Sequence, residues 1–230
     1  MKKLVIFDLD GTLLDTIEDL GSATNDALRT LGFPERKRDE YYGLVGRGIM
    51  NLFRGAVPPG CDTPETIDRM RELFLAHYGK HLCDFTHPYP GIMDLLERIT
   101  ARGVRLAVAS NKYQEGAETV IRHYFGRFSF VALLGQREGF PIKPDPGIVE
   151  LCMKAAGVAK DEVLYVGDTN VDMQTGLNAG VDTVGVTWGF RTREELEAFK
   201  PLAVIDTAEE LERIILRYLS TLKPVLFETK

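Results

Sequence analysis

Residues 4–12 read Leu-Val-Ile-Phe-Asp-Leu-Asp-Gly-Thr, an apolar run followed at once by two aspartates. Four apolar residues in a row, bounded by turn-forming residues, are typical of a parallel strand that is buried on both faces. Similar runs recur at 104–109, 130–134, 163–166 and 183–186, with a weaker one at 203–205. We therefore expect an open sheet of mainly parallel strands.

Helical patterns lie between most of these runs. Apolar residues repeat with helical spacing over 92–101. Asp145-Pro146 suits the start of the next helix, with Asp as N-cap and Pro at the first helical position. A third helix is expected over 170–179, with Gly180 as its stop. Strands that alternate with helices predict an α/β fold, a three-layer doubly wound sheet covered on both faces.

One long interval, between the first strand and the helix at 92, contains no convincing strand. Helical apolar stripes cover 16–31 and 66–82, and Pro88, Pro90 and Gly91 suit a stiff hinge. The sequence therefore predicts a core domain of residues 1–15 and 89–230 and a small helical domain of residues 16–88.

Composition narrows the range of partners. The net charge of −6 gives no general field that would attract nucleic acid or an anionic membrane. No apolar run approaches the ~20 residues that span a bilayer, and Asp8 interrupts the N-terminal apolar stretch too early for a signal peptide. Three scattered cysteines without paired spacing fit a reducing compartment. We expect a cytoplasmic protein, monomer or homodimer, with no assigned role for the tail at 221–230.

Polar side chains follow each of the first four predicted strands. In an open α/β sheet, ligands bind beyond the carboxyl ends of the strands, so these side chains are expected to share one site. The set comprises Asp8, Asp10 and Thr12 after the first strand, Ser110 and Asn111 after the second, Lys143 after the third, and Asp168 and Asp172 after the fourth.

Several carboxylates at one site repel one another unless a cation lies between them. Mg²⁺ prefers oxygen ligands and commonly sits between carboxylates and a phosphate, whereas the absence of histidine and cysteine from the set disfavours zinc. A lysine beside such a metal suits a phosphate oxygen. The residue chemistry therefore indicates a magnesium-dependent phosphate site.

Four strings in this set resemble the motifs of the haloacid dehalogenase superfamily, and they occur in that family's order. Residues 8–12 resemble its first motif, Ser110-Asn111 its second, 143–146 its third and 167–172 its fourth. The helical segment 16–88 is similar to the family's C1-type cap domain.

This resemblance implies a covalent mechanism. Asp8 attacks phosphorus and forms an aspartyl-phosphate, while Asp10 protonates the leaving alcohol and then activates water. Mg²⁺ is held by the carboxylates of Asp8 and Asp168 and by the backbone carbonyl of Asp10, and Asp172 orients a metal-bound water or the groups behind it. An acid at the position of Asp10 favours phosphoryl transfer over carbon–halogen cleavage in the family.

The remaining motif residues are expected to handle the phosphate. The resemblance implies that Ser110 and the Asn111 amide hold phosphate oxygens and that Lys143 neutralises charge between Asp8 and phosphate. Thr12 supports the turn that carries Asp10 and is counted with the substrate-binding groups.

Three short segments, 45–48, 87–91 and 186–189, resemble those of phosphoglycolate phosphatases. We therefore expect 2-phosphoglycolate or a similar small phosphate ester as substrate, with Arg47 as the candidate partner of its carboxylate; the alternative for Arg47 is a surface residue of a turn. Two other functions stay open. A β-phosphoglucomutase-like mutase would need sugar-binding residues in the cap, and a non-catalytic binding module would have no need of Asp10.

His77 and His81 stand four residues apart, close to Cys83 and His87, a spacing that can bind zinc. No acid completes a helical metal motif there. We expect a solvated face of the cap.

Overall fold

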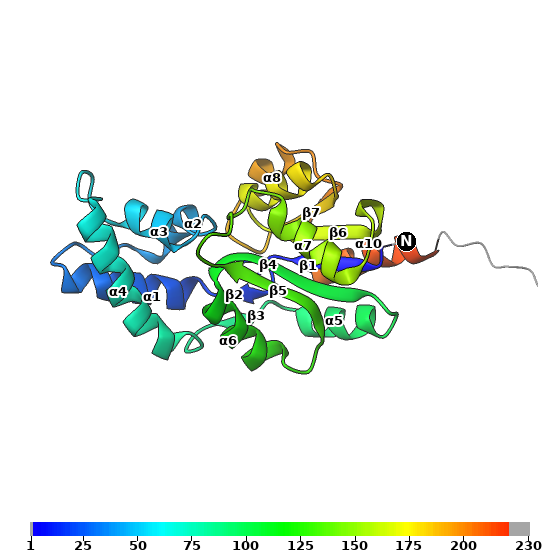
Figure 1. Cartoon of the computed structure of the whole chain (residues 1–230), viewed down its shortest axis with the longest axis horizontal. Coiled ribbons are helices and arrows are strands. Elements are labelled where there is room, and N and C mark those ends of the chain that lie inside the picture. The colour runs from blue at the N-terminus through cyan, green and yellow to red at the C-terminus, as the bar shows by residue number, and fades with distance from the viewer. Residues whose placement is uncertain (1, 221–230) are drawn as a thin grey trace, which may run out of the picture.

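The computed structural model describes residues 2–220. The tail at 221–230 lies outside these residues. Six strands form one parallel sheet in the order β5-β4-β1-β6-β7-β8 (Figure 1). They are β1 (Leu4–Phe7), β4 (Arg105–Tyr113), β5 (Phe130–Gln136), β6 (Val163–Gly167), β7 (Asp182–Val186) and β8 (Ala203–Ile205). The predicted parallel α/β sheet is confirmed.

Strand β1 lies at the centre of this sheet. Phe7, its last residue, pairs with Val108 on β4 and with Val166 on β6. The first residue after β1 therefore emerges between the carboxyl ends of two neighbouring strands, which is where open α/β sheets bind their ligands.

Helices cover both faces of the sheet. The side chains of Leu4 and Ile6 pack in one apolar cluster, under α7 (Gly147–Ala156) and the end of α8 (Asn170–Ala179). The alternate residues Val5 and Phe7 pack in the other, with α5 (Ile92–Thr100), α6 (Gln114–Phe125) and α10 (Ala208–Ser220). This period of two is the reason that a fully buried strand is apolar at every position. The short elements η1 (Lys160–Glu162) and α9 (Arg193–Glu197) complete the core.

Several element boundaries differ from the prediction by one or more residues, and two of these differences lie close to the predicted site. Helix α7 begins at Gly147, so Pro146 rather than Asp145 occupies the N-cap position. The Asp145 side chain, one residue before the N-cap, instead accepts a 2.8 Å hydrogen bond from the N–H of Gly147, the first helical residue. Strand β4 continues through Tyr113 instead of ending at Ala109, and its pairing with β5 is irregular between these two residues. The stop at Gly180 is confirmed by its left-handed φ of 67°.

Four helices gather at one end of the molecule, away from the sheet (Figure 1). They are α1 (Ile17–Thr30), α2 (Arg38–Leu44), α3 (Ile49–Ala56) and α4 (Pro64–His81). The chain enters and leaves this group through an antiparallel pair, β2 (Leu14–Asp15) and β3 (His87–Pro88). We refer to this helical group as the cap. Its bounds at 16 and 88 as a separate domain stay a prediction.

The cap has its own apolar interior and a fixed exit. Phe74 lies 5.2 Å from Phe53 and 4.8 Å from Tyr78 between ring centres. The buried carboxylate of Asp19 on α1 accepts hydrogen bonds from the N–H groups of Phe85 and Thr86 at 2.8–3.2 Å. The first cap helix is thereby tied to the segment that leaves the cap. None of the helices in residues 2–220 is both long and apolar enough to cross a membrane.

Candidate active site

The loop after β1 is a compact turn. The N–H groups of Thr12, Leu13 and Leu14 all point to the carbonyl of Leu9, at 3.0–3.3 Å. Gly11 has a φ of +87°, and a Cβ there would lie 2.2 Å from Oδ2 of Asp168. Glycine is therefore required twice over, for the backbone conformation and for the approach of the β6 loop.

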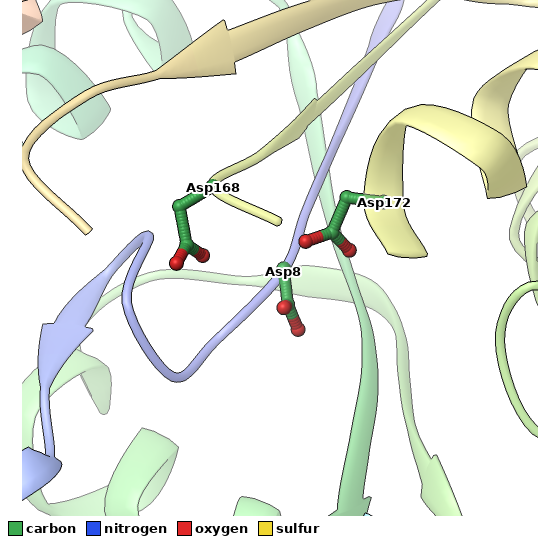
Figure 2. A group of neighbouring side chains, drawn as sticks. All are labelled: Asp8, Asp168 and Asp172. Atoms are coloured by element: carbon green, nitrogen blue, oxygen red, sulfur yellow. The ribbon is translucent and has the colours of Figure 1, made fainter. Parts of the chain in front are cut away.

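Three carboxylates converge beyond the ends of β1 and β6. Oxygens of Asp8, Asp168 and Asp172 lie within 4.8 Å of one another, and all three residues are buried. Figure 2 shows Asp8 at the end of β1, Asp168 in the loop after β6 and Asp172 on α8, all pointing into one space.

Asp172 is fully bonded within the protein. One oxygen accepts from Lys143 Nζ at 2.7 Å and from the Tyr165 hydroxyl at 2.9 Å. The other accepts from the N–H and the hydroxyl of Thr169 at 3.0 and 2.6 Å. Lys143 Nζ also lies 2.8 Å from Asp8, so this buried ammonium bridges the nucleophile candidate and Asp172.

Burial and crowding change how these acids hold protons. Burial, with the charge of Asp172, raises the pKa of Asp8 to about 7 although Lys143 opposes the change. Burial, with the charges of Asp172 and Asp8, raises the pKa of Asp168 well above its usual range. Burial acts the same way on Asp172, but the charge and hydrogen bond of Lys143 outweigh it and lower the pKa of that carboxyl. The cluster holds one lysine for three acids and so favours a further cation.

These residues fit a hard divalent ion. Within residues 2–220, Oδ2 of Asp8 has no hydrogen-bond donor, whereas its Oδ1 accepts from the Leu9 N–H at 2.7 Å. Asp168 receives single bonds from Thr12 and Phe190, at 2.7 and 2.9 Å. Carboxylate oxygens with remaining lone pairs suit Mg²⁺. Asp172, with both oxygens occupied, suits a place behind the ligands.

The second motif lies where β4 leaves its regular pairing with β5, between Ala109 and Tyr113. The Ser110 hydroxyl accepts from the Lys112 N–H at 3.2 Å, which leaves its own proton free to donate. The Asn111 side chain is already engaged: it accepts from the Lys143 N–H at 2.8 Å and donates to the Gly46 carbonyl at 3.0 Å. The Asn111 side chain therefore links its own loop to Gly46 and to Lys143. The expected contact between Asn111 and phosphate would then be made by its backbone N–H.

Thr12 does not face the substrate space. Its side chain is buried and donates to Asp168 at 2.7 Å, and its carbonyl accepts from the indole of Trp188 at 3.0 Å. The Thr12 hydroxyl thus orients Asp168 and does not line the pocket, and a part for Thr12 in substrate binding stays a prediction.

A narrow pocket opens between this cluster and the cap. The space that admits the centre of a water-sized sphere is about 30 Å³. The core contributes Asp8, Asp10 and the loop from Ser110 to Tyr113, and the cap contributes Leu20, Val45, Gly46, Gly48, Ile49, Leu52 and Tyr78.

Arg47 lies outside this pocket. Its exposed side chain lines a neighbouring surface groove with Asn51 and Asn170. The structure therefore does not bring Arg47 together with Asp8 and Asp10, although its neighbours Gly46 and Gly48 reach the pocket.

Sequence reasoning missed Lys112. This buried lysine donates to Asp10 at 3.0 Å and to the hydroxyl of Tyr78, on α4 of the cap, at 2.7 Å. Its position directly after Ser110-Asn111 was the available signal. Tyr78 gave none, because it falls on the apolar stripe of a helix.

Arg191, in the loop before α9, was missed as well. Its guanidinium donates to the carbonyls of Tyr42, Gly43 and Val45 at the end of α2. An arginine of the core thus binds the backbone of the cap beside the pocket.

The histidines of α4 pair with acids. His77 lies 3.3 Å from Asp26 and His81 lies 2.7 Å from Asp84, and both side chains are partly exposed. Across residues 2–220, the single group that could hold a metal ion is the cluster of Asp8, Asp168 and Asp172.

Comparison with known proteins agrees with this fold and site. Residues 5–186 match the family model described as haloacid dehalogenase-like hydrolase. The chain therefore belongs to the haloacid dehalogenase-like hydrolase family, as the four motifs predicted.

Within that family it is similar to phosphoglycolate phosphatases. It is 33% identical to that of Pseudomonas putida over 92% of this chain and 79% of the relative. It is 32% identical to that of Mesorhizobium japonicum over 93% of this chain and 97% of the relative. A crystal structure of a predicted phosphoglycolate phosphatase from Haemophilus somnus superposes with a TM-score of 0.86 at 28% identity, over 93% of this chain and 97% of that one.

Proposed function

We propose that this family member is a Mg²⁺-dependent phosphomonoesterase that works through an aspartyl-phosphate on Asp8. Its proposed substrate is 2-phosphoglycolate or a similarly small phosphate ester. One observation carries the proposal: Asp8 lies in a buried carboxylate cluster with Lys143 Nζ 2.8 Å away and also lines a pocket that Asp10 shares. Similarity to phosphoglycolate phosphatases over nearly the whole chain supports the same activity.

The reaction follows from the placement of the two acids. The Asp8 carboxylate attacks phosphorus, the P–O bond to the alcohol breaks, and the alcohol oxygen takes a proton from Asp10. Asp10 then accepts a proton from water as that water attacks phosphorus, which releases inorganic phosphate and restores Asp8. Lys143 and the Ser110 hydroxyl offset negative charge on the phosphoryl oxygens.

Asp8, Asp168 and the backbone carbonyl of Asp10 would hold Mg²⁺, with Asp172 behind them. When bound, the ion supplies positive charge that brings a dianionic phosphate against the carboxylates. Burial, and then repulsion between the acids, raises the pKa of Asp8 and Asp168; without the ion, the same repulsion also opposes phosphate binding.

The dimensions of the pocket support a small substrate. Its narrow space is far below the few hundred Å³ typical of pockets for larger ligands. On the cap side, Leu20, Val45, Ile49 and Leu52 are apolar, and the one hydrogen-bonding side chain among the described lining residues, Tyr78, is already bonded to Lys112. These features favour a small ester over the phosphosugar of a mutase.

We further propose a cytoplasmic location and a small molecule as the only partner that the reaction needs. The free thiols of Cys61, Cys83 and Cys152 suit a reducing compartment. The chain is expected to act as a monomer or homodimer.

The test is a phosphate-release screen over small phosphate esters, with Mg²⁺ or with EDTA. We expect 2-phosphoglycolate among the best substrates, activity that requires Mg²⁺, and a loss of more than about 1,000-fold in Asp8→Asn. The matched control is Asp62→Asn, an exposed cap acid, which should retain full activity. Acid-quenched enzyme should carry phosphate on Asp8.

Activity that survives Asp8→Asn would contradict the mechanism. Accumulation of a sugar bisphosphate with no net phosphate release would identify a mutase. Ligand binding with no turnover of any ester would identify a binding module.

A further inference from the structure

We propose that Lys112, held from the cap by Tyr78, binds an anionic group on the leaving alcohol. The preferred substrates would then be phosphate esters that carry a carboxylate on the carbon next to the ester oxygen. This inference rests on the proposed phosphatase function and assigns to Lys112 the role that the sequence alone suggested for Arg47.

The contacts of Lys112 place its charge beside the reacting groups. Its Nζ lies 3.0 Å from Oδ1 of Asp10 and 2.7 Å from the Tyr78 hydroxyl, and only 2% of its side chain is exposed. An ammonium has three N–H groups. Within residues 2–220, the short contacts to Asp10 Oδ1 and Tyr78 take two of them. The remaining contact, to Oδ2 of Asp10, is long at 3.4 Å, so the third N–H can turn to a ligand oxygen instead.

The charge of Lys112 also lies at the pocket between the cap and the core. Among the described residues that line the pocket, Lys112 is the one lysine or arginine. The other cation near the reacting groups, Lys143, bridges Asp8 and Asp172 below the phosphate position. An anionic group that enters between the cap and Asp10 therefore meets Lys112 and no competing cation.

The separation from Asp10 sets the length of the substrate. Asp10 donates its proton to the ester oxygen across one hydrogen bond, and Lys112 is one hydrogen bond beyond Asp10. The two steps together span about 6 Å or less. A carboxylate one carbon from the ester oxygen can bond to Lys112 across that span. A longer acid would have to fold back within a space that is already narrow.

Tyr78 makes this arrangement depend on the cap. Its side chain is fully buried on α4 and packs 4.8 Å from Phe74, so the position of its hydroxyl follows the position of the helix. The hydrogen bond between Tyr78 and Lys112 thus joins cap and core at the point where the leaving group would bind.

The experiment compares 2-phosphoglycolate with its neutral amide, 2-phosphoglycolamide, at saturating Mg²⁺. The two esters differ in charge and little in shape, so the ratio of their kcat/KM values reports recognition of the carboxylate. We expect the wild-type protein to prefer the acid by at least about 10-fold, the range of one charge-assisted hydrogen bond. Lys112→Met, which keeps the length and apolar stem of the side chain, should bring the ratio close to one.

Tyr78→Phe provides a second variant that keeps the ring and its packing. It should lower the ratio about 3- to 10-fold, mainly through a higher KM for the acid. The control is Tyr124→Phe, which likewise loses a hydrogen-bonded hydroxyl, here one that donates to the Thr86 carbonyl at 2.6 Å, at a position that does not line the pocket. Its ratio should equal that of the wild type.

If Lys112→Met and Tyr78→Phe lower kcat/KM equally for the acid and the amide, the inference is overturned, because Lys112 would then only position Asp10. A wild-type ratio near one would overturn it as well. Wild-type protein that releases phosphate from no ester at all would instead overturn the proposed function.

Discussion

At the residue scale, the site depends on a position with no side chain. Gly11 combines a φ of +87° with a space in which a Cβ would lie 2.2 Å from Asp168. These two demands can be separated by experiment, because Gly60 has a φ of +81° and nothing within 4 Å of its virtual Cβ.

Gly11→Ala should therefore lose activity by more than about 100-fold, since the added methyl group displaces a carboxylate that must be placed within a fraction of an ångström. Gly60→Ala should cost only the backbone strain, about 1–2 kcal/mol, or a few degrees in Tm, at unchanged kcat. Steady-state kinetics and thermal unfolding of both variants check this. Comparable activity losses in the two would show that the approach to Asp168 is unimportant.

Asp8 illustrates a conflict between activity and stability. Burial and the charge of Asp172 raise its pKa to about 7. In the metal-free protein, an ionised Asp8 therefore lowers the free energy of unfolding. Asp8→Asn removes one charge from the cluster and retains an oxygen that can accept from Lys143.

At pH 8 and without metal, we expect the Tm of Asp8→Asn to equal that of the wild type or to exceed it by up to about 3 °C, although the variant has lost turnover. Thermal unfolding in EDTA measures this. A clear drop in Tm would mean that Asp8 contributes more through its bond to Lys143 than it loses through repulsion.

At the element scale, the closed position of the cap depends on backbone groups as well as on side chains. The end of α2 presents the carbonyls of Tyr42, Gly43 and Val45, which no longer have partners within the helix. Arg191 of the core donates to all three, and Asn111 donates to the next carbonyl along, at Gly46.

Arg191→Ala should loosen this contact and raise KM for the substrate about 5- to 20-fold, because the charge-assisted bonds are partly exposed and each contributes a modest amount. The nearby Arg193 pairs with Glu197 and Asp206 on the core surface and is the matched control. Limited proteolysis should cleave the cap of Arg191→Ala faster than that of Arg193→Ala. Identical KM values in both variants would show that Arg191 does not contribute to closure of the cap.

At the scale of the whole molecule, ligand binding should stabilise the cap and core together. Mg²⁺ with a phosphate mimic such as orthovanadate would contact residues at the carboxyl ends of β1, β4 and β6 and in the loop with Lys143. At a hundred times Kd, such a ligand adds about 2.7 kcal/mol to the free energy of unfolding. We expect a rise in Tm of about 5–10 °C that EDTA reverses and that Asp168→Ala abolishes. A shift that persists in Asp168→Ala would place the ion elsewhere.

Much of this architecture could be predicted from the sequence. The strands at 4–7 and 203–205 and the helix at 170–179 were placed with their observed bounds, because continuous apolar runs and a terminal Gly180 are local signals. Helices α2, α6, α9 and α10 were not predicted. The N-cap of α7 was displaced by one residue, since propensity fixes the ends of elements poorly. The meeting of Asp8, Lys143 and Asp168 followed from the rule that strand ends share an edge.

Contacts across elements could not be predicted in the same way. Lys112 meets Tyr78 only because α4 folds over the end of β4, and nothing local to either residue specifies that crossing. Arg47 was chosen for its chemistry and its turn, yet its side chain lines the neighbouring groove. Thr12 was placed near substrate because it follows Asp10, although the turn directs its hydroxyl to Asp168.

The central place of β1 has a consequence for biosynthesis. As the chain is synthesised, β1 gains a partner on one edge when β4 follows, but its other edge stays unpaired until β6 is made. At ordinary translation speeds, the wait from residue 4 to residue 163 lasts about ten to thirty seconds. Until then the nascent chain carries a wholly apolar strand with at least one unpaired edge, and we expect the yield of folded protein to depend on shelter by a chaperone at this stage.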